Sequence, residues 1–378
     1  MQYKKKSHGK NAISILTFIV LISLMVASVV FILNKHKTTD TISDQVSIGQ
    51  SDVKSIQATL LTEDIPINQS SNLVDTTIAL NSATVNDSYY QYLKPKDLNA
   101  KYVMVYNKTT NQIVYQKDID ALCYPASTTK LLTCAVALEY VSPDTIFTVG
   151  DELSLVPADS SLAYLSKGEK ISLNDLLYGL MLPSGNDAGY VIAVNVARRV
   201  SGNDKLSNKD AVSYFAELMN KTAKNIGMEN SNFVVPDGFH DDKHYVTTKD
   251  MMKLLLYADS FPLLKKVAST YKYQVKIKSG QDYTWLNSNR LIDKSSEFYY
   301  EGVSTGKTGF HDDAGHCMAF VCNKNGMDIY VVIMNSQTAI YRNRDALNLL
   351  NMIYNPKEIK IGEQWDLKPD ETTSKKGD

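Results

Sequence analysis

The sequence predicts a mixed α/β fold of the α+β kind, in which helices flank one antiparallel β-sheet that carries an all-helical insertion. Strand-like runs of alternating apolar residues occur near both ends of the region from about residue 95 to 355, and helical spacing dominates its middle. Strands from both ends are expected to pair in one sheet, because each has an apolar face to bury. A charge-free apolar segment and a long polar segment precede this region, so we expect a transmembrane helix and a disordered linker before it.

The expected strands form two groups. Residues 101–106 and 112–116 flank the turn-forming sequence Asn-Lys-Thr-Thr-Asn, which predicts a first hairpin. Later strands are expected at residues 271–278, 303–309, 316–323 and 328–335, and the turn Asn-Lys-Asn-Gly joins the last two into a second hairpin. Helices are expected from Ser127 to about residue 138 and at residues 173–182, 187–200, 211–226, 248–258 and 342–354.

Residues 12–33 are the expected membrane anchor. They carry no charge, and as a helix these 22 residues would span roughly 33 Å, enough for a hydrocarbon core of about 30 Å. Four lysines lie within residues 1–11, so the positive-inside rule places that end in the cytosol and the remaining chain on the extracytoplasmic face of the cell membrane. The alternative is a cleaved signal peptide and a secreted protein, although the apolar segment exceeds the usual length of about 7–15 residues.

Residues 34–90 are the expected flexible linker. Residues 34–88 contain no aromatic residue and are rich in Ser, Thr, Asn, Asp and Gln, so they cannot bury enough apolar surface to offset the entropy lost on ordering. The globular domain is expected at residues 91–356, followed by a polar tail at 357–378.

Composition excludes several classes of protein. A formal net charge of −1 gives no attraction to nucleic acid, and a hydrophobic content of 44% suits a globular protein. The four cysteines, at positions 123, 134, 317 and 322, show no Cys-x-x-Cys spacing, so we expect no metal and no cofactor. We favour buried free thiols over disulfides, because Cys317 and Cys322 are an odd number of residues apart on an expected strand and so face opposite sides.

Three short motifs carry the chemistry: Ser-Thr-Thr-Lys at residues 127–130, Ser-Gly-Asn at 184–186 and Lys-Thr-Gly at 307–309. Each is weak alone, since Ser-x-x-Lys occurs five times, Ser-Gly-Asn twice and Lys-Ser/Thr-Gly twice. Ser127 is distinguished because it opens an apolar helix, where Lys130 shares its face. A serine with a lysine one turn later can perform acyl transfer without a histidine.

The chain resembles the serine D-alanyl-D-alanine carboxypeptidases, the low-molecular-mass penicillin-binding proteins. Besides the three motifs, the resemblance includes Phe-Val-Val-Pro-Asp-Gly-Phe at 233–239, His-Tyr-Val-Thr-Thr-Lys-Asp at 244–250 and Asn-Ser-Asn at 287–289, and it covers roughly residues 95–355. It implies a β-lactamase/transpeptidase-like fold. It also implies peptidoglycan stem peptides ending in D-Ala-D-Ala as substrates and β-lactams as covalent inhibitors. Better-known members often have a C-terminal β-rich domain and a C-terminal membrane helix, whereas here the expected anchor is N-terminal.

The resemblance implies three catalytic residues. Ser127 would be the nucleophile that forms an acyl-enzyme, and Lys130, as a neutral amine, would accept its proton. Burial and a second cation nearby, Lys307, would favour that neutral amine. Ser184 would relay a proton to the departing D-alanine.

The same resemblance implies five substrate-binding residues. Asn186 would hold both Lys130 and a substrate amide. Lys307 and the Thr308 hydroxyl would bind the terminal carboxylate, and Gly309 would let the substrate lie beside the strand as an added edge. The backbone N–H of Phe310, with that of Ser127, would form the oxyanion hole.

Three alternatives remain. A serine β-lactamase would share the motifs but needs a glutamate that activates water; the one near match begins at Glu217, inside an expected helix. A zinc peptidase would use the His/Asp sequences at residues 240–244 and 311–316, which we expect to be solvated loops. A non-catalytic wall-binding protein would keep the fold and lose activity, which the three intact motifs argue against.

Overall fold

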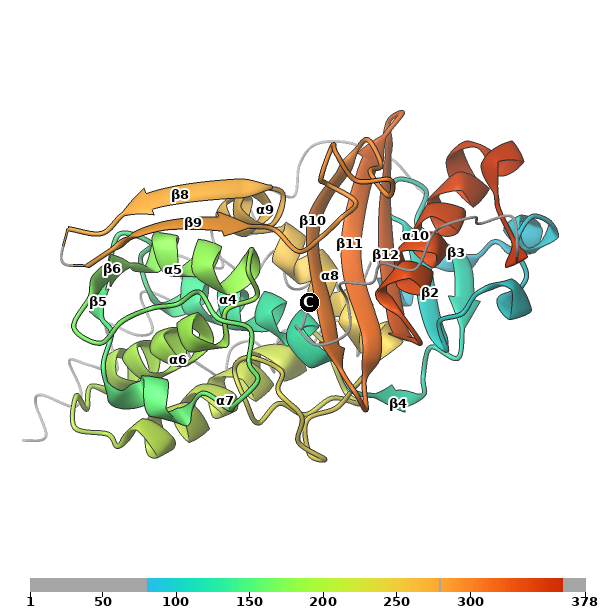
Figure 1. Cartoon of the computed structure of the whole chain (residues 1–378). Helices are drawn as coiled ribbons and strands as arrows, with labels where there is room; N and C mark the ends of the chain where they lie inside the picture. The colour runs from blue at the N-terminus through green and yellow to red at the C-terminus, as the bar shows by residue number, and fades with distance from the viewer. Residues whose placement is uncertain (1–79, 279, 363–378) are drawn as a thin grey trace, which may run out of the picture. The chain divides into compact units, whose positions relative to one another are not determined.

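The computed structural model describes residues 80–278 and 280–362, all of which lie in the second of two compact units, residues 58–378 (Figure 1). The predicted anchor at 12–33, most of the predicted linker and most of the tail therefore lie outside the described residues. Within the described ranges, no helix has both the length and the apolar character needed to cross a bilayer.

A six-stranded sheet forms the centre of the described unit, in the order β1-β3-β2-β12-β11-β10. Neighbouring strands are antiparallel, with Val105 opposite Val331 and Lys307 opposite Ala319, except that β1 runs parallel to β3. The predicted pairing of strands from both ends of the domain is confirmed, and β10 is an edge strand. The strands are β1 (Thr84–Val85), β2 (Tyr102–Asn107), β3 (Gln112–Lys117), β10 (Val303–His311), β11 (Gly315–Lys324) and β12 (Met327–Ser336).

Helices cover both faces of this sheet (Figure 1). Alternate residues of β2 point into two separate cores: Met104 packs with α8 (Thr248–Asp259), and Val105 packs with α10 (Ala339–Tyr354). Strand residues buried on both sides form apolar runs, which explains why β11 and β12 are apolar almost throughout. Cys317 and Cys322 lie in different cores, as their odd spacing predicts, and all four cysteines are buried free thiols.

The strand predicted at residues 271–278 is confirmed, although it lies outside the central sheet. The region between β3 and β10 also contains strands that were not predicted, so the prediction of an all-helical insertion is wrong. Three further two-stranded sheets lie in it: β4 (Leu122–Cys123) with β7 (Val246–Thr247), β5 (Ile146–Thr148) with β6 (Lys170–Ser172), and β8 (Lys272–Lys276) with β9 (Asp282–Leu286). Strands of two or three residues are too short to show a period of two, and β9 follows a polar turn. The helices of this region are α4 (Lys130–Tyr140), α5 (Leu173–Met181), α6 (Asn186–Ser201), α7 (Asn208–Asn225) and α9 (Pro262–Ala268).

The ordered region begins earlier than predicted. Residues 80–90, assigned to the linker from their composition, include β1 and most of the 3₁₀ helix η1 (Asp87–Gln91). Leu80 is buried, and the Tyr90 ring stacks on Tyr115 at a centroid distance of 4.9 Å. A two-residue strand held mainly by backbone pairing leaves no apolar pattern in the sequence, which is why composition missed it.

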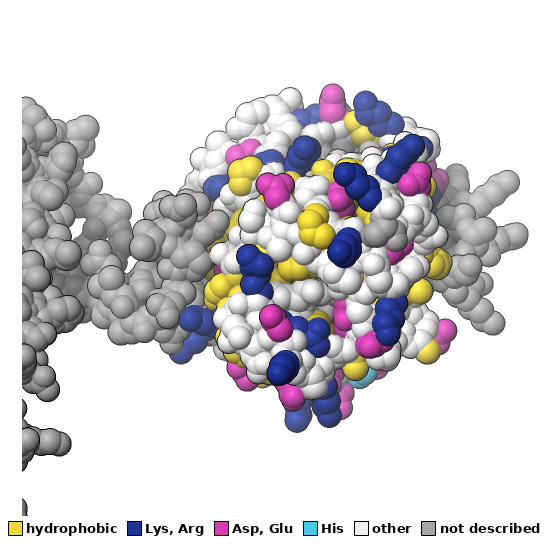
Figure 2. All heavy atoms as spheres, turned by 90° about the vertical axis from the view of Figure 1, so that its left-hand side faces the viewer, with side chains coloured by type: hydrophobic (Ala, Val, Ile, Leu, Met, Phe, Trp, Pro, Cys, Tyr) yellow, Lys and Arg dark blue, Asp and Glu magenta, His cyan; other side chains and the backbone are white. Residues whose placement is uncertain are grey.

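The described surface in Figure 2 carries cationic and anionic side chains interspersed, with scattered apolar ones. This face shows no broad patch of a single charge, as a net charge of −1 suggests.

Candidate active site

Ser127 lies in a 3₁₀ helix, η3 (Ala126–Thr129), directly before α4. The sequence predicts an α-helix that opens at Ser127, whereas α4 begins at Lys130. A 3₁₀ turn places residues i and i+3 even more directly above each other, so the predicted adjacency survives. The Lys130 Nζ atom is 2.7 Å from Ser127 Oγ.

Lys130 is fully buried and makes three hydrogen bonds. Besides Ser127 Oγ, its Nζ donates to Asn186 Oδ1 and to the main-chain oxygen of Asp237, both at 2.8 Å. These last two partners are acceptors only, because neither oxygen carries a proton. When the amine is neutral, its two N–H groups can therefore serve these oxygens, and its lone pair faces the hydroxyl of Ser127.

Burial lowers the pKa of Lys130 to about 8 from its usual 10.5, because desolvation disfavours the ammonium form. The carboxylates of Asp237 and Asp187 act in the opposite direction and are weaker. Desolvation thus accounts for the lowered pKa, and the predicted contribution of Lys307 as a second cation stays a prediction.

Ser184 occupies the turn between α5 and α6 in the left-handed region, with φ of 62°. Its side chain is fully buried, and its Oγ has no hydrogen-bond partner among the described residues. A buried hydroxyl without a partner, on a backbone conformation that a serine rarely adopts, is a feature found at functional sites. The carboxylate of Asp187 holds the loop that contains Ala163 and Leu165. It accepts hydrogen bonds from the backbone N–H groups of these two residues at 2.8 and 3.0 Å.

The edge strand β10 lies against the turn that carries Ser127. A Cβ on Gly309 would come within 2.8 Å of Ser127 N, so this close approach requires glycine. Lys307 is buried and donates from Nζ to the Thr308 carbonyl at 2.8 Å, and Thr308 Oγ1 is 2.7 Å from Ser288 Oγ. The Phe310 ring stacks on His316 at a centroid distance of 4.2 Å. The structure therefore joins Ser127, Lys130 and Asn186 on the helical side and sets Lys307, Thr308, Gly309 and Phe310 on the strand that packs against the turn of Ser127. Ser184 lies two residues before Asn186, and its Oγ makes no hydrogen bond with the other described residues.

Several further residues of the site were not predicted. Asp237 contributes a main-chain oxygen and has a buried carboxyl whose pKa burial raises. Ser160 accepts a hydrogen bond from Asn186 Nδ2 at 3.0 Å, and Ser288 pairs with Thr308. The resembling segment at residues 233–239 was the one signal that pointed toward Asp237; contacts through main-chain atoms leave no other mark in a sequence.

The His/Asp loops are predicted to be solvated, and for His244 this prediction is wrong. It is 1% exposed, and its Nδ1 accepts the Val234 N–H at 3.1 Å, so its Nε2 donates to Thr129 Oγ1 at 2.8 Å. Burial lowers the pKa of His244 to about 3, which keeps it neutral. Its hydrogen bond to Thr129 stabilises the 3₁₀ turn that carries Ser127.

Gly238 packs closely against the same turn, and a substitution there tests how tight this packing is. Its φ is +81°, and an added Cβ would lie 1.9 Å from the carbonyl oxygen of Ala126, which itself has φ of 47°. We expect Gly238→Ala to lower the free energy of unfolding by more than about 2 kcal/mol, since both the left-handed backbone and a clash with main chain oppose it. Gly202→Ala is the matched control: its φ is +65° with no atom within 4 Å, so about 1 kcal/mol is expected. Equal losses in thermal or urea unfolding would contradict the clash.

The rival sites receive little support. Glu217 is exposed on α7, and within the described part of the chain no glutamate is hydrogen-bonded to Ser127, Lys130, Ser184 or Asn186. Of the histidines at 240–244 and 311–316, His244 is engaged with Thr129 and His316 with Phe310, which argues against either as a ligand of a catalytic zinc ion.

A cavity adjoins the site. It has a volume of about 690 Å³ and is lined in part by Ser160, Tyr164, Asp187 and Gln281. Because Ser160 both lines this cavity and holds Asn186, the cavity lies next to the amide side chain of the site.

The sequence and structure match known enzymes over the same region. The sequence model of the peptidase family described as D-alanyl-D-alanine carboxypeptidase matches residues 90–338. The D-alanyl-D-alanine carboxypeptidase DacF of Bacillus subtilis is 26% identical over 263 residues, which cover 68% of this chain and 63% of that protein. The match thus spans less than two thirds of the Bacillus protein. The D-alanyl-D-alanine carboxypeptidase of Streptomyces sp. strain K15 is 30% identical over 254 residues, which cover 65% of this chain and 84% of that protein.

Solved structures of related enzymes match the same region of the chain. The crystal structure of the Streptomyces K15 DD-transpeptidase matches with a TM-score of 0.62 at 29% identity, over 68% of this chain and 97% of that chain. The D-alanyl-D-alanine carboxypeptidase DacD from Francisella tularensis matches with a TM-score of 0.58 at 26% identity, over 68% of this chain and 71% of that chain. These matches confirm the mixed α/β fold and the predicted resemblance, and the chain belongs to the D-alanyl-D-alanine carboxypeptidase family of serine peptidases.

Proposed function

We propose that this enzyme removes the terminal D-alanine from peptidoglycan stem peptides ending in D-Ala-D-Ala, through an acyl-enzyme on Ser127. The observation that carries the proposal is the environment of Lys130: a buried amine whose other two partners are acceptors only, 2.7 Å from the hydroxyl of Ser127. Ser127 is the one partner that can donate a proton to the lone pair of the amine.

In the acylation step, Ser127 Oγ attacks the carbonyl carbon of the penultimate D-alanine as its proton passes to Lys130 Nζ. The negative charge that develops on the carbonyl oxygen is stabilised by the backbone N–H groups of Ser127 and Phe310, one on each side of the close contact at Gly309. When the C–N bond breaks, the leaving D-alanine takes up a proton. Ser184 relays that proton, and its buried hydroxyl, which has no partner among the described residues, supports this role.

Water then attacks the ester carbonyl, gives up a proton through Lys130, and releases the shortened peptide as Ser127 regains its hydroxyl hydrogen. Asn186 keeps the amine in place throughout, since its Oδ1 accepts from Lys130. We propose that the stem-peptide residues before D-Ala-D-Ala bind in the cavity beside Ser160. From there they can reach the amide of Asn186.

Lys307 and Thr308 bind the terminal carboxylate, which gives the preference for free C-termini. The edge position of β10 supports this role, because a substrate can lie along its unpaired side. Loss of one hydrogen bond to a charged group is worth about 1.5–3 kcal/mol, or roughly 10- to 100-fold.

We therefore expect Thr308→Val to lower kcat/KM for D-alanine release by about 10-fold or more. The substituted side chain has the same shape and lacks the hydroxyl. Thr284→Val is the control, since Thr284 is exposed on β9 and its hydroxyl pairs with Gln274. Steady-state kinetics with diacetyl-Lys-D-Ala-D-Ala compares them; equal rates in both variants would remove Thr308 from the carboxylate site.

The proposed placement of the enzyme follows from its N-terminal sequence. Residues 12–33 anchor it in the cytoplasmic membrane as a single span, and a linker that ends before residue 80 holds the catalytic domain on the outer side. No nucleic acid and no cofactor take part. Resistance of the catalytic domain in intact cells to an external protease would contradict this placement if the same domain is cleaved once the cells are permeabilised.

One experiment separates the proposal from its rivals. The full-length protein is incubated with penicillin and analysed by intact mass spectrometry, and its turnover of diacetyl-Lys-D-Ala-D-Ala and nitrocefin is measured with and without EDTA. We expect one stable penicilloyl adduct, D-alanine release and slow nitrocefin hydrolysis. Many nitrocefin turnovers per second would indicate a β-lactamase. Inhibition by EDTA but not by penicillin would indicate a zinc peptidase. The absence of a penicilloyl adduct would indicate a non-catalytic binding protein.

A further inference from the structure

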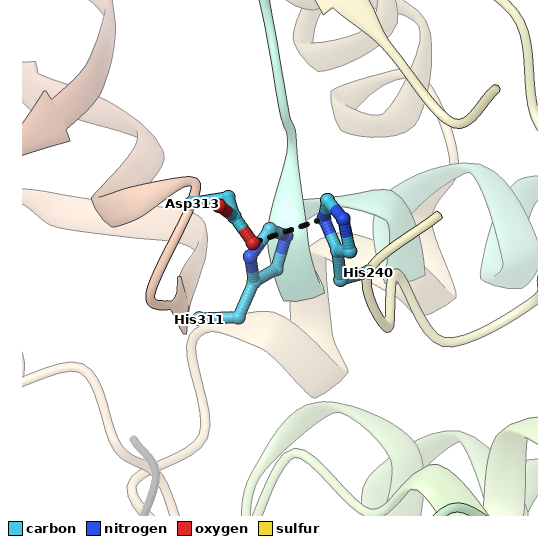
Figure 3. Close-up of side chains that lie close together, drawn as sticks. All are labelled: His240, His311 and Asp313. Carbon is cyan, nitrogen blue, oxygen red and sulfur yellow. Dashed lines mark ion pairs between the residues drawn. The ribbon is translucent and has the colours of Figure 1, made fainter. Parts of the chain in front are cut away.

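Three potential metal ligands meet outside the catalytic residues. His240 lies in the loop between α7 and β7, His311 is the last residue of β10, and Asp313 lies in the turn to β11. One donor atom from each lies within 4.8 Å of the other two, and Figure 3 shows the three side chains directed toward one another. We propose that these residues bind a single divalent transition-metal ion of the zinc type.

The spacing fits a tetrahedral ion. With metal–ligand bonds of about 2.0–2.1 Å, two ligand atoms of a tetrahedron are about 3.4 Å apart. His240 Nδ1 and Asp313 Oδ2 are 3.4 Å apart, so this pair already has the separation that zinc requires. The rings of His240 and His311 have their centroids 5.1 Å apart at 67°, close enough for small rotations to bring a nitrogen of each onto the same ion.

Asp242 supplies an outer carboxylate. It lies on the opposite side of the His240 ring, with Oδ1 3.5 Å from Nε2, while Nδ1 faces Asp313. Metal-binding histidines commonly donate their second N–H to a carboxylate, which fixes the tautomer and orients the ring. Asp242 is thus placed to accept the Nε2–H of His240 when Nδ1 binds the ion.

His311 would bind the ion through Nε2. Its Nδ1 accepts the Ala314 N–H at 3.2 Å, which leaves Nε2 as the nitrogen that the backbone does not use. Burial and the neighbouring His240 lower the pKa of His311 to about 4, so the ring is uncharged at neutral pH. Coordination through Nε2 moves the ring proton to Nδ1 and ends the bond to Ala314, a loss of about one neutral hydrogen bond.

The donor set selects the metal. Two imidazole nitrogens and one carboxylate suit zinc and its transition-metal neighbours, whereas calcium and magnesium prefer oxygen ligands. The two loops also carry Asp241 and Asp312, and Lys243 is the one cation in the segment 240–244, so negative charge predominates around the three ligands.

The ligands connect the segments that build the active site. Gly309 contacts the turn of Ser127, and His311 follows two residues later on the same face of β10, about 7 Å further along. Asp237, three residues before His240, holds Lys130. The ring of Tyr124, three residues before Ser127, packs against both imidazoles at 5.0 and 5.9 Å. A bound ion therefore acts as a clamp between β10 and the loop of Asp237.

Metal binding is tested directly on full-length protein from which metals have been removed with EDTA. Isothermal titration with ZnCl₂, Co²⁺ absorption spectra and melting temperature are measured for the wild type, His240→Gln, Asp313→Asn and the matched control Asp312→Asn. His240, Asp312 and Asp313 are exposed, so these substitutions leave the fold intact. The readouts do not depend on peptidase activity.

We expect one Zn²⁺ per chain, a Zn²⁺-dependent rise in melting temperature and the strong visible absorption of tetrahedral Co²⁺. His240→Gln and Asp313→Asn should weaken binding by at least about 10-fold, and Asp312→Asn by less than about 3-fold. Absence of binding below about 100 μM Zn²⁺, or equal binding by Asp313→Asn and Asp312→Asn, overturns the proposed site.

Discussion

Ser127→Ala is expected to abolish both acylation by penicillin and release of D-alanine. Removal of the nucleophile eliminates the covalent intermediate, so kcat/KM should fall by at least about 10⁴-fold. The substitution removes one half-exposed hydroxyl at the mouth of the site and should leave the melting temperature within a few degrees of the wild type.

Intact mass spectrometry after penicillin treatment, followed by peptide mapping, checks this result. Ser184→Ala is an informative comparison, because Ser184 is proposed to transfer a proton and not to form the ester. It should still be acylated at Ser127, although more slowly. An adduct on Ser127→Ala, or an adduct mapped to another side chain of the wild type, would contradict the assignment of the nucleophile.

Lys130→Arg is expected to be almost as inactive as Ser127→Ala, with acylation slowed by at least about 10³-fold. Arginine keeps a positive charge near Ser127 but is not deprotonated in proteins, so it cannot accept the proton of the serine. If Lys130 acted only as a positive charge that holds the substrate, arginine would retain much of the activity.

Lys130→Met is the complementary variant, because methionine is of similar length and has no proton acceptor of comparable strength. Both variants should be slow for the same reason. The second-order rate constant for acylation by a fluorescent penicillin distinguishes the roles: recovery to within about 10-fold of wild type in Lys130→Arg alone would mean that charge, and not basicity, is what Lys130 provides.

Much of the fold followed from the sequence because its signals are local. The alternation in residues 101–116 and 316–335 indicated the strands that form the sheet, and the odd spacing of Cys317 and Cys322 placed them in different cores. The adjacency of Ser127 and Lys130 needed only helical geometry. Such patterns depend on side chains a few residues apart and are visible in one chain.

The missed features depend on contacts between distant parts of the chain. The carbonyl of Asp237 that holds Lys130 lies 107 residues away, and a main-chain oxygen has no residue-type signature. The aspartate-rich surroundings of His244 predict a solvent-exposed side chain, whereas the fold buries it against Thr129. Strands β5 and β6 are three residues each, too short for periodicity to reveal.

The pH dependence of acylation tests the central claim, that the neutral amine of Lys130 activates Ser127. A base with its pKa near 8 is mostly protonated at pH 6, and its reactive form increases tenfold with each pH unit until the pKa is passed. The rate constant for acylation by penicillin should therefore rise with a slope of about one from pH 6 and level off above about pH 8. A rate that is constant over this range, or that falls as the pH rises through it, would contradict the account.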